Sequence, residues 1–412
     1  MEVIHRIIAG LDVHQAVVVV CLRVQRGRRV TRTERRFGTT VPELLAMSDW
    51  LTEAGCPLAI IESSGVYWKP VFNILESSLE VVLVNAYQAK SMAGYKTDRM
   101  DAERLAELGA HGLVRGSFIP PAVIRELREI TRYRKSLVQT RVSQINRAGK
   151  VLEGANIKLA SVVSDIVGAS GRAMMRALIA GERDPAVLAG LAKGSLRSKT
   201  DELIPALTGR FLAGHAFLLA QILDHIEYLE RQIEAVSEEV ARLCEPFREA
   251  VELLMTIPGV GTTTAQTIVA EIGLDMTRFT SAQHLASWAG LCPGNNESAG
   301  KRRSGRTRKG NRWLRAALSE AAWSASRAKG SAFQALYRRL AFRRGKGVKK
   351  AQVAVAHALL VSVWHILNEM TPYREALLLQ RTAPDPQKIT RTLVKRLEKL
   401  GFTVTLEHKA AA

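Results

Sequence analysis

The chain has 412 residues, 47% of them hydrophobic and 24% charged, a composition that indicates two or three globular domains and argues against a disordered polypeptide. Its 59 Lys and Arg residues outnumber 39 Asp and Glu residues, and the net charge of +20 favours a polyanionic partner, first nucleic acid and second an anionic membrane surface. No apolar run is long enough to span a bilayer, no signal sequence is evident, and the four scattered cysteines argue against a zinc site or a disulfide framework.

Residues 1–119 are predicted to form an α/β domain. Five apolar segments have the pattern of strands: 6–12, 16–24, 28–37, 58–63 and 80–85. The first three follow one another through short turns, which predicts an antiparallel meander. Helical patterns precede the fourth and the fifth, beginning with residues 41–55. This alternation predicts a mixed sheet flanked by helices.

A long helical region is predicted over residues 120–250. Apolar residues recur there at alternating spacings of three and four, which is the pattern of a coiled-coil seam. They are Leu219, Ile222, Ile226, Leu229, Ile233, Val236, Val240 and Leu243. A basic helix at 122–153 carries a matching apolar line, interrupted by Thr131, and is the predicted partner within one chain or across a dimer. The sequence assigns no role to residues 154–215.

A third, mainly helical domain is predicted over residues 251–370, and a tail follows at 371–412. The domain ends with a long apolar helical segment at 351–370. The tail contains a helical pattern at 390–401 and a strand pattern at 402–407.

Four acidic residues of the first domain occupy informative positions. Asp12 and Glu62 end the first and fourth predicted strands, and an RNase H-like sheet places those two strand ends side by side. Asp98 and Asp101 are three residues apart at the start of a helical pattern, so both can project from one helix face. Each residue also has an ordinary interpretation, as a helix cap, a first-turn acid, a turn residue or a solvated strand end.

Carboxylates that are brought together repel each other unless a cation lies between them. Mg²⁺, with Mn²⁺ as the alternative, prefers such oxygen ligands, and two metal ions can stabilise the attacking and leaving oxygens of phosphoryl transfer. We therefore predict a metal-dependent phosphoryl-transfer site in a protein whose basic surface holds nucleic acid.

The third domain offers two candidate nucleic-acid contacts. The segment IPGVG at 257–261 resembles a helix-hairpin-helix, in which Gly259 and Gly261 would let backbone N–H groups approach a phosphate; an ordinary helix–helix turn is the alternative. Residues 291–315 form a predicted flexible basic loop that would follow a phosphate backbone, or else a solvated run of charge. Its cations are Lys301, Arg302, Arg303, Arg306, Arg308, Lys309, Arg312 and Arg315.

Ser298 and Ser304 lie in the same segment. A serine hydroxyl attacks phosphorus when nearby cations or a base activate it, but a loop serine by itself is weak evidence for a nucleophile.

These motifs together resemble a known family. The resemblance is carried in order by GLDVHQ, IIESSGVYWKPVF, YKTDRMDAERLAELGAHGLV, IPGVGTTTAQTIVAEIG and PGNNESAGKRRSGRTRKGNRWLRAAL. They resemble the DEDD-type transposases of bacterial insertion sequences, the insertion-sequence-110 group, to which the Piv DNA invertase is related. The likeness runs from residue 6 to about residue 370.

The resemblance implies a RuvC-like catalytic domain, a coiled coil and a C-terminal transposase domain. It matches Asp12, Glu62, Asp98 and Asp101 to the four metal ligands of the family. In the family a serine five residues after a proline is the nucleophile that links covalently to DNA. Ser298 follows Pro293 by that spacing, while Ser304, which precedes a glycine as in many relatives, competes for the role.

We therefore expect a transposase or site-specific recombinase that acts on the ends of its own element and on target DNA. The resemblance also implies a structured guide RNA, and the coiled coil predicts a dimer or tetramer. The absence of targeting signals and of cysteine pairs is typical of the bacterial cytoplasm, where the protein would associate with the nucleoid and not with a membrane. Two alternatives remain: a RuvC-like junction-resolving nuclease that uses water, and a non-catalytic nucleic-acid-binding scaffold.

Overall fold

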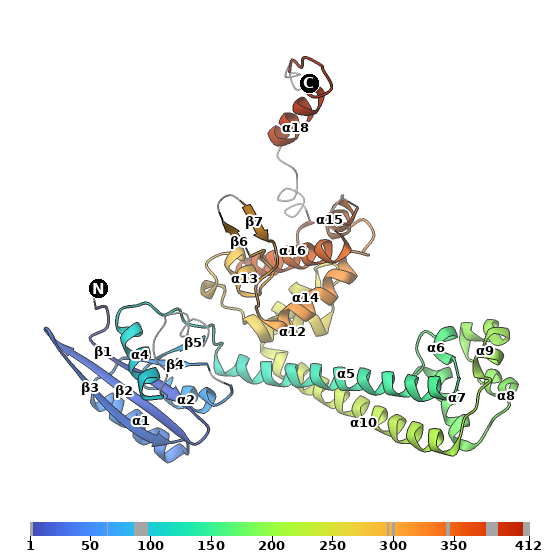
Figure 1. The fold of residues 1–412 in the computed structure, drawn as a ribbon, viewed down its shortest axis with the longest axis horizontal. Helices are drawn as coiled ribbons and strands as arrows, with labels where there is room; N and C mark the ends of the chain where they lie inside the picture. Colours follow the sequence, from blue (N-terminus) through green and yellow to red (C-terminus); the bar gives the residue numbers. More distant parts are fainter. Residues whose placement is uncertain are drawn as a thin grey trace. The chain divides into compact units, whose positions relative to one another are not determined.

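The structure is a computed structural model that describes residues 3–63, 65–85, 98–294, 296–298, 301–342, 347–375 and 386–406. The chain divides into two compact units, Met1–Ile119 and Pro120–Ala412. The first unit is an α/β domain and the second is almost entirely helical (Figure 1).

The first unit contains the predicted five-stranded mixed sheet. Its strands are β1 (Ile7–Val13), β2 (Val17–Arg26), β3 (Arg29–Gly38), β4 (Leu58–Glu62) and β5 (Glu80–Val84). Their order is β3-β2-β1-β4-β5; the first three are antiparallel neighbours, and β1, β4 and β5 run parallel. This is the order of an RNase H-like sheet, so the predicted fold of the N-terminal domain is confirmed.

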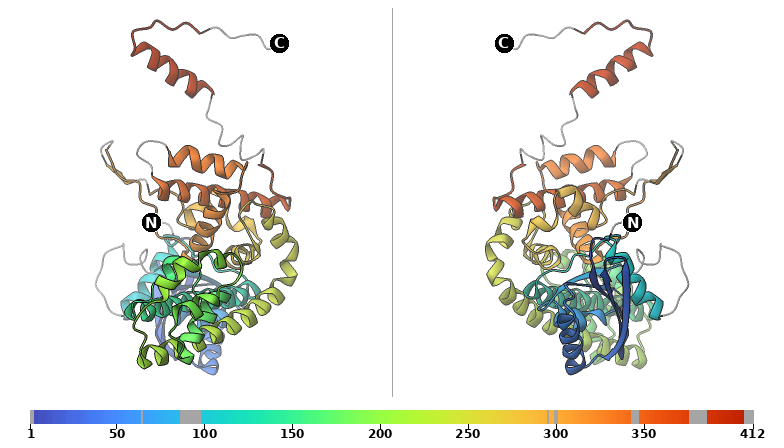
Figure 2. Two further views of the ribbon diagram at one scale, coloured as in Figure 1. Left: turned by 90° about the vertical axis from the view of Figure 1, so that its right-hand side faces the viewer. Right: turned by 90° about the vertical axis from the view of Figure 1, so that its left-hand side faces the viewer.

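Helices cover both faces of this sheet. Ala9, Leu11 and Val13 of β1 belong to one apolar cluster together with residues of α1 (Val41–Glu53) and α2 (Trp68–Leu75). Ile8 and Ile60 belong to a second cluster, on the face that α4 (Asp98–Ala110) covers. The right-hand view of Figure 2 shows the strands between α1 and α4. Because β1 and β4 are buried on both faces, they consist mainly of apolar residues.

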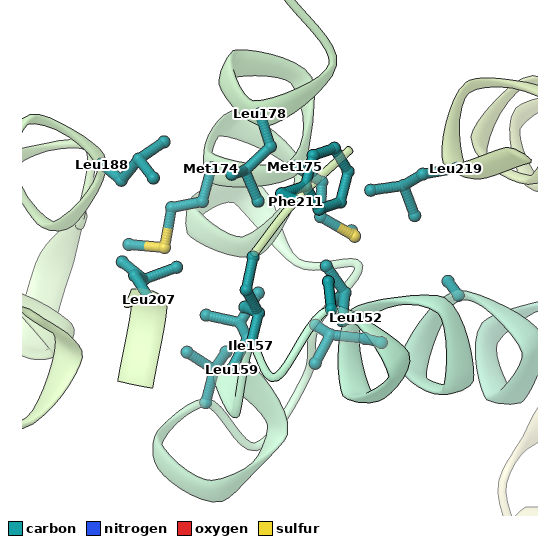
Figure 3. Packing of buried hydrophobic residues seen from close by; sticks show 14 of the residues in the cluster. Leu152, Ile157, Leu159, Met174, Met175, Leu178, Leu188, Leu207, Phe211 and Leu219 are labelled. Carbon is teal, nitrogen blue, oxygen red and sulfur yellow. The ribbon is translucent and has the colours of Figure 1, made fainter. Parts of the chain in front are cut away.

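The second unit begins with two long helices that lie side by side and antiparallel, α5 (Ala122–Gly154) and α10 (Ala213–Cys244) (Figure 1). A small helical cap connects them. It consists of α6 (Leu159–Val162), α7 (Ala169–Ala180), α8 (Pro185–Gly190), η1 (Gly194–Lys199) and α9 (Thr200–Leu207). Figure 3 shows its core, where Met174, Met175 and Phe211 meet Leu152 of α5 and Leu219 of α10. The residues without a sequence-assigned role therefore close the end of this helical pair.

The contact between α5 and α10 follows the predicted seam only in part. Leu219, Ile226, Leu229 and Val240 are buried, but Ile222, Ile233, Val236 and Leu243 are only half-buried. On α5 the buried positions include polar residues, Thr131, Arg134 and Gln144. A regular apolar seam would not admit these side chains. A polar contact also joins the two helices, because Arg141 of α5 donates to Glu230 of α10 at 2.6 Å.

The remaining elements form a helical domain with one hairpin and a C-terminal helix. They are η2 (Glu245–Phe247), α11 (Arg248–Met255), α12 (Thr262–Ile272), η3 (Met276–Arg278), α13 (Ala282–Trp288), β6 (Asn296–Ser298), β7 (Lys301–Ser304), α14 (Arg312–Ala325), α15 (Ala332–Ala341), α16 (Val348–Glu369) and α18 (Pro386–Glu398). The strand predicted at 402–407 is wrong over the described residues 402–406, because that segment has no neighbouring strand to pair with.

Helix α16 is the central helix of this domain and contacts α11, α13, α14 and α15. Among the described residues it is the one helix long and apolar enough to cross a membrane, with a mean hydropathy of 1.4. Because 56% of that apolar window is buried inside the protein, the apolar character is explained by its place in the core.

Candidate active site

Asp12 and Glu62 lie at adjacent strand ends on one face of the sheet. The parallel register pairs Leu11 with Ile61, so the next positions along β1 and β4 are Asp12 and Glu62. Side chains alternate between the two faces, which places both acids on the face of Ile8 and Ile60, under α4. Asp12 is 9% exposed, and its Oδ2 lies 3.0 Å from Nε2 of His14.

Helix α4 lies unusually close to this face because β1 has a glycine there. A Cβ atom added at Gly10 would lie 2.1 Å from the carbonyl oxygen of Ala102. Further along α4, Gly109 lies against Ile8 and Ile60. The helix therefore runs antiparallel to β1, and its first turn points toward the strand end that carries Asp12. Residues 98–101 form this first turn; Asp101 is half-buried, and the side chain of Asp98 lies outside the described residues.

A buried arginine on β2 fastens α4 to the sheet. Arg23 is 2% exposed, and its Nε donates to Oε2 of Glu107 at 2.8 Å. Arg32 of β3 donates to the same carboxylate at 3.1 Å, and His111 lies 3.1 Å from its Oε1. Burial opposes ionisation of Glu107, but the hydrogen bonds from Arg23 and Arg32 outweigh it and lower the pKa to about 2.

Replacing Glu107 with Gln is expected to lower the stability of the protein by about 1 kcal/mol at neutral pH, after allowance for the partial exposure of the pair. Because the pKa of Glu107 is depressed in the folded state, this stabilisation is present above the ordinary carboxyl pKa of 4.5 and is lost as pH falls toward 2. Thermal melts of Glu107→Gln and wild type should therefore converge in acid. Glu53→Gln, on exposed α1 surface, is the control; a constant difference at all pH values would contradict the prediction.

The acidic residues suit a hard divalent cation, because carboxylate oxygens are the ligands that Mg²⁺ and Mn²⁺ prefer. The glycine at position 10 supports this fit, since it lets the first turn of α4 approach the two strand ends. Among the side chains that the structure describes, no three His, Cys, Asp or Glu residues lie together closely enough to hold a metal ion. The fourth acid, Asp98, is not in that set.

The basic segment at 291–315 is not the flexible loop that its glycines predict. Residues 296–298 and 301–304 form an antiparallel hairpin, and Pro293 and Thr307 extend it by one bridge. Figure 2 shows the hairpin projecting from the helices. Gly310 has a structural reason to be glycine, since an added Cβ atom would lie 2.4 Å from the backbone of Gly290.

The two candidate serines lie at different levels of this hairpin. Ser298 pairs with Lys301 at the far end of the described strands, whereas Ser304 pairs with Asn296 nearer the base. The Ser304 hydroxyl accepts a hydrogen bond from the backbone N–H of Arg306 at 3.1 Å. The side chain of Ser298 lies outside the described residues.

The predicted phosphate-binding cations differ in their surroundings. Arg306, Arg308, Lys309 and Arg312 are exposed, and Arg312 stacks over the Trp313 ring at 4.6 Å. Arg315 instead donates to the carbonyl oxygen of Arg308 at 3.2 Å and so holds the segment in place. The side chains of Lys301, Arg302 and Arg303 are outside the described residues.

The two glycines of the IPGVG turn also differ. Gly259 has φ +88°, and an added Cβ atom would lie 2.4 Å from the backbone nitrogen of Ala325 in α14, so this glycine faces protein. Gly261 caps the N-terminus of α12 and has open space beside it. A phosphate could therefore approach Gly261 and the exposed Thr262, but not the side of Gly259 that α14 covers.

Sequence reasoning missed a buried ionic cluster centred on Glu271. Its side chain is completely buried at the C-terminal end of α12. Arg132 of α5 donates two hydrogen bonds of 2.7 Å to its carboxylate, and Asn311 donates a third. Asn311 also accepts from the N–H groups of Trp313 and Leu314 and so caps α14. The cluster joins the long helix to the end of the basic segment. An apolar stretch interrupted by one acid, AQTIVAEIG, was the available signal.

Two family models match this sequence. Residues 9–157 match a model of DEDD transposases of the IS110 type, and residues 251–338 match the model described as the transposase IS116/IS110/IS902 family. Together they cover more than half of the chain and include every candidate site residue.

Relatives with known names support the same grouping. The transposase for insertion sequence element IS1111A of Coxiella burnetii is 24% identical over 381 residues, 89% of this chain and 91% of that protein. The pilin gene-inverting protein of Moraxella bovis is 31% identical over 155 residues, 36% of this chain and 48% of that protein. The chain thus matches about half the length of that relative. Among solved structures, T. thermophilus RuvC in complex with a Holliday junction substrate matches 27% of this chain at 11% identity and a TM-score of 0.21.

Proposed function

The chain belongs to the IS116/IS110/IS902 family of transposases, and from this premise we propose that it moves a bacterial insertion sequence by cutting and rejoining DNA at the ends of the element and at its target. The observation that carries the proposal is the juxtaposition of Asp12 and Glu62 at adjacent strand ends beneath the first turn of α4. Carboxylates at the strand ends can bind a divalent metal ion. The excess of 20 positive charges over the chain can bind a polyanion such as DNA.

Asp12, Glu62, Asp98 and Asp101 are the residues that would hold Mg²⁺ or Mn²⁺. A bound divalent cation supplies Lewis-acid stabilisation of the charge that develops on phosphate oxygens. His14, at 3.0 Å from Asp12, restricts the orientation of that carboxylate. The Arg23–Glu107 contact and the glycine at position 10 set the distance of α4 from the strand ends.

Ser298 is the proposed nucleophile. Its hydroxyl oxygen would lose a proton and form a bond to the scissile phosphorus, while the bond from phosphorus to a deoxyribose oxygen breaks and that oxygen takes up a proton. The reverse step, with the hydroxyl of another strand, would release the serine and rejoin DNA. The exposed cations Arg306, Arg308, Lys309 and Arg312, with Lys301, Arg302 and Arg303, would hold the strand at the hairpin.

Other partners follow from the same proposal. The half-buried apolar positions of α10, including Ile233 and Val236, would bury further in a dimer or tetramer built on a coiled coil of α5 and α10. The turn between α11 and α12 would contact DNA as a helix-hairpin-helix through the open side of Gly261. A structured guide RNA would occupy part of the basic surface, and the protein would act in the bacterial cytoplasm.

Covalent trapping tests the serine. Wild-type protein incubated with DNA carrying the element ends and Mg²⁺ should give a protein–DNA adduct that survives denaturing electrophoresis, and Ser298→Ala should lose it. Ser304→Ala is the matched control and should retain the adduct, because Ser304 is engaged with the backbone of Arg306. Loss of the adduct only in Ser304→Ala would identify Ser304, and not Ser298, as the nucleophile.

The same experiment separates the alternatives. A junction-resolving nuclease that uses water would cut DNA and leave no adduct in any variant. A non-catalytic scaffold would bind DNA but show no cutting at any Mg²⁺ concentration.

A further inference from the structure

A groove of about 950 Å³ lies at the base of the hairpin, against the first half of α16. Its volume is within the range of sites that bind small organic molecules or single nucleotides. Its described lining comes from the base of the hairpin, the end of α15 and the first half of α16. None of the candidate catalytic residues is among the described residues that line it.

The groove combines an apolar surface with positive charge. Leu291 is buried, and Leu340 and Val353 are half-buried, so carbon atoms make up much of the surface. Arg306, Lys349 and Lys350 are exposed and supply three cations, whereas none of the described residues that line the groove is acidic. A ligand with an apolar, flat part and an adjacent anionic group complements this surface.

His357 adds a neutral polar group to the groove. Burial lowers the pKa of its imidazole. A neutral imidazole can both donate and accept a hydrogen bond, which suits the edge of a base better than a phosphate.

The groove lies at the base of the hairpin that carries the proposed nucleophile. Pro293 and Thr307, which line it, are bridged across the hairpin, and the next pair is Asn296 with Ser304. Gly305, which also lines the groove, is four residues from Lys301, the partner of Ser298, roughly 13 Å at the rise of a strand. A nucleotide in the groove would therefore belong to the same stretch of strand as a phosphate at Ser298, a short distance along it.

We infer that this groove holds one unpaired nucleotide of the DNA strand cut at the hairpin, with its base against Leu340 and Val353 and its phosphate against Lys349 and Lys350. A base within a duplex cannot enter, because its stacking and pairing partners surround it. The inference rests on the proposed function, because it assumes that the strand bound at the hairpin is DNA. The groove would then favour DNA that is unpaired near the cleavage site.

Binding without metal tests the inference separately from catalysis. Full-length protein in EDTA is titrated with a short DNA duplex that contains one unpaired 2-aminopurine nucleotide, and with the same duplex fully paired. Wild type should bind the first about tenfold more tightly, a difference of 1.4 kcal/mol. Ala354→Trp, which fills the groove, should remove this preference and leave affinity for the paired duplex unchanged. Ala335→Trp, on exposed surface of α15 outside the groove, should retain it.

A second pair of variants tests the cations. Lys349→Ala with Lys350→Ala should reduce the salt dependence of binding to the unpaired probe by about one ion, because the contact to the one phosphate in the groove is lost. Lys395→Ala with Lys399→Ala removes the same charge from the end of α18 and the turn after it, and should reduce the salt dependence less. An unaltered preference in Ala354→Trp would overturn the inference, and a stronger preference for the same probe made of RNA would reassign the groove to RNA. Neither result depends on Ser298 or on the acidic residues, so failure here leaves the proposed cleavage chemistry untouched.

Discussion

Replacing Asp12 with Asn is expected to lower the rate of DNA strand cleavage by roughly 1000-fold, which is the scale of charge stabilisation that a bound divalent cation supplies. The amide preserves the size of the side chain on β1 and removes the negative charge next to Glu62. Binding of DNA in EDTA should stay within about twofold of wild type, because the cations of the hairpin are unchanged.

Metal binding can be measured without any reaction. Mg²⁺ should raise the melting temperature of the wild-type protein, since a ligand that binds only the folded state stabilises it. The increase should be absent in Asp12→Asn and in Asp98→Asn. Asp49→Asn, an exposed position on α1 at the opposite face of the sheet, should behave as wild type. Undiminished recombination by Asp12→Asn would defeat the proposed metal site.

Replacing Glu271 with Ala is expected to destabilise the second unit by about 3 kcal/mol, because it removes the completely buried counter-ion of two partly buried arginines. Arg132 would lose two hydrogen bonds of 2.7 Å, and Arg128, only 14% exposed in its side chain, would lose a carboxylate at 3.6 Å. Burial already lowers the pKa of Arg128 to about 10, an effect that Glu271 partly offsets. Asn311 would also lose its acceptor at the start of α14.

The structure provides a matched control for this prediction. Glu320 of α14 also pairs with a cation of α5, Lys135, but Glu320 is 65% exposed. Glu320→Ala should therefore cost less than about 1 kcal/mol. Urea unfolding followed by tryptophan fluorescence measures both variants. Equal losses of unfolding free energy in the two variants would show that the burial of Glu271 does not determine how much it stabilises the protein.

The N-terminal fold could be predicted because each strand carries its own pattern. The run VVVVCL has apolar residues on both faces, as a central strand requires, and the charged residues of RVTRTERR are typical of an edge strand. The order of meander, helix, strand, helix and strand then leaves few arrangements of the sheet. The positions of Asp12 and Glu62 at the strand ends followed from that order.

The fold of the second unit is harder to predict, because the apolar periodicity of a helix does not show which neighbouring helices it packs against. The apolar line of α10 predicted a partner helix, but Arg134 is buried toward α12, where its Nη1 donates to Gln266 at 3.0 Å. A helix that contacts both α10 and α12 cannot present a single regular seam. The basic segment has the sequence pattern of a loop because its two strands are short, and such strands are stable only through their pairing with each other.

The amino-acid sequence by itself determined the positive charge, the five strands, the two long helices and the order of the acidic residues, since these depend on composition and on contacts between near neighbours. Only the tertiary structure decided at which glycines another segment packs so closely that a side chain would not fit, as α4 does at Gly10 and α14 at Gly259. It also decided that Glu271 is a buried counter-ion and that a groove forms beside the hairpin. The physical reason is that close approach, desolvation and cavities arise between residues far apart in the chain, where local pattern carries no information.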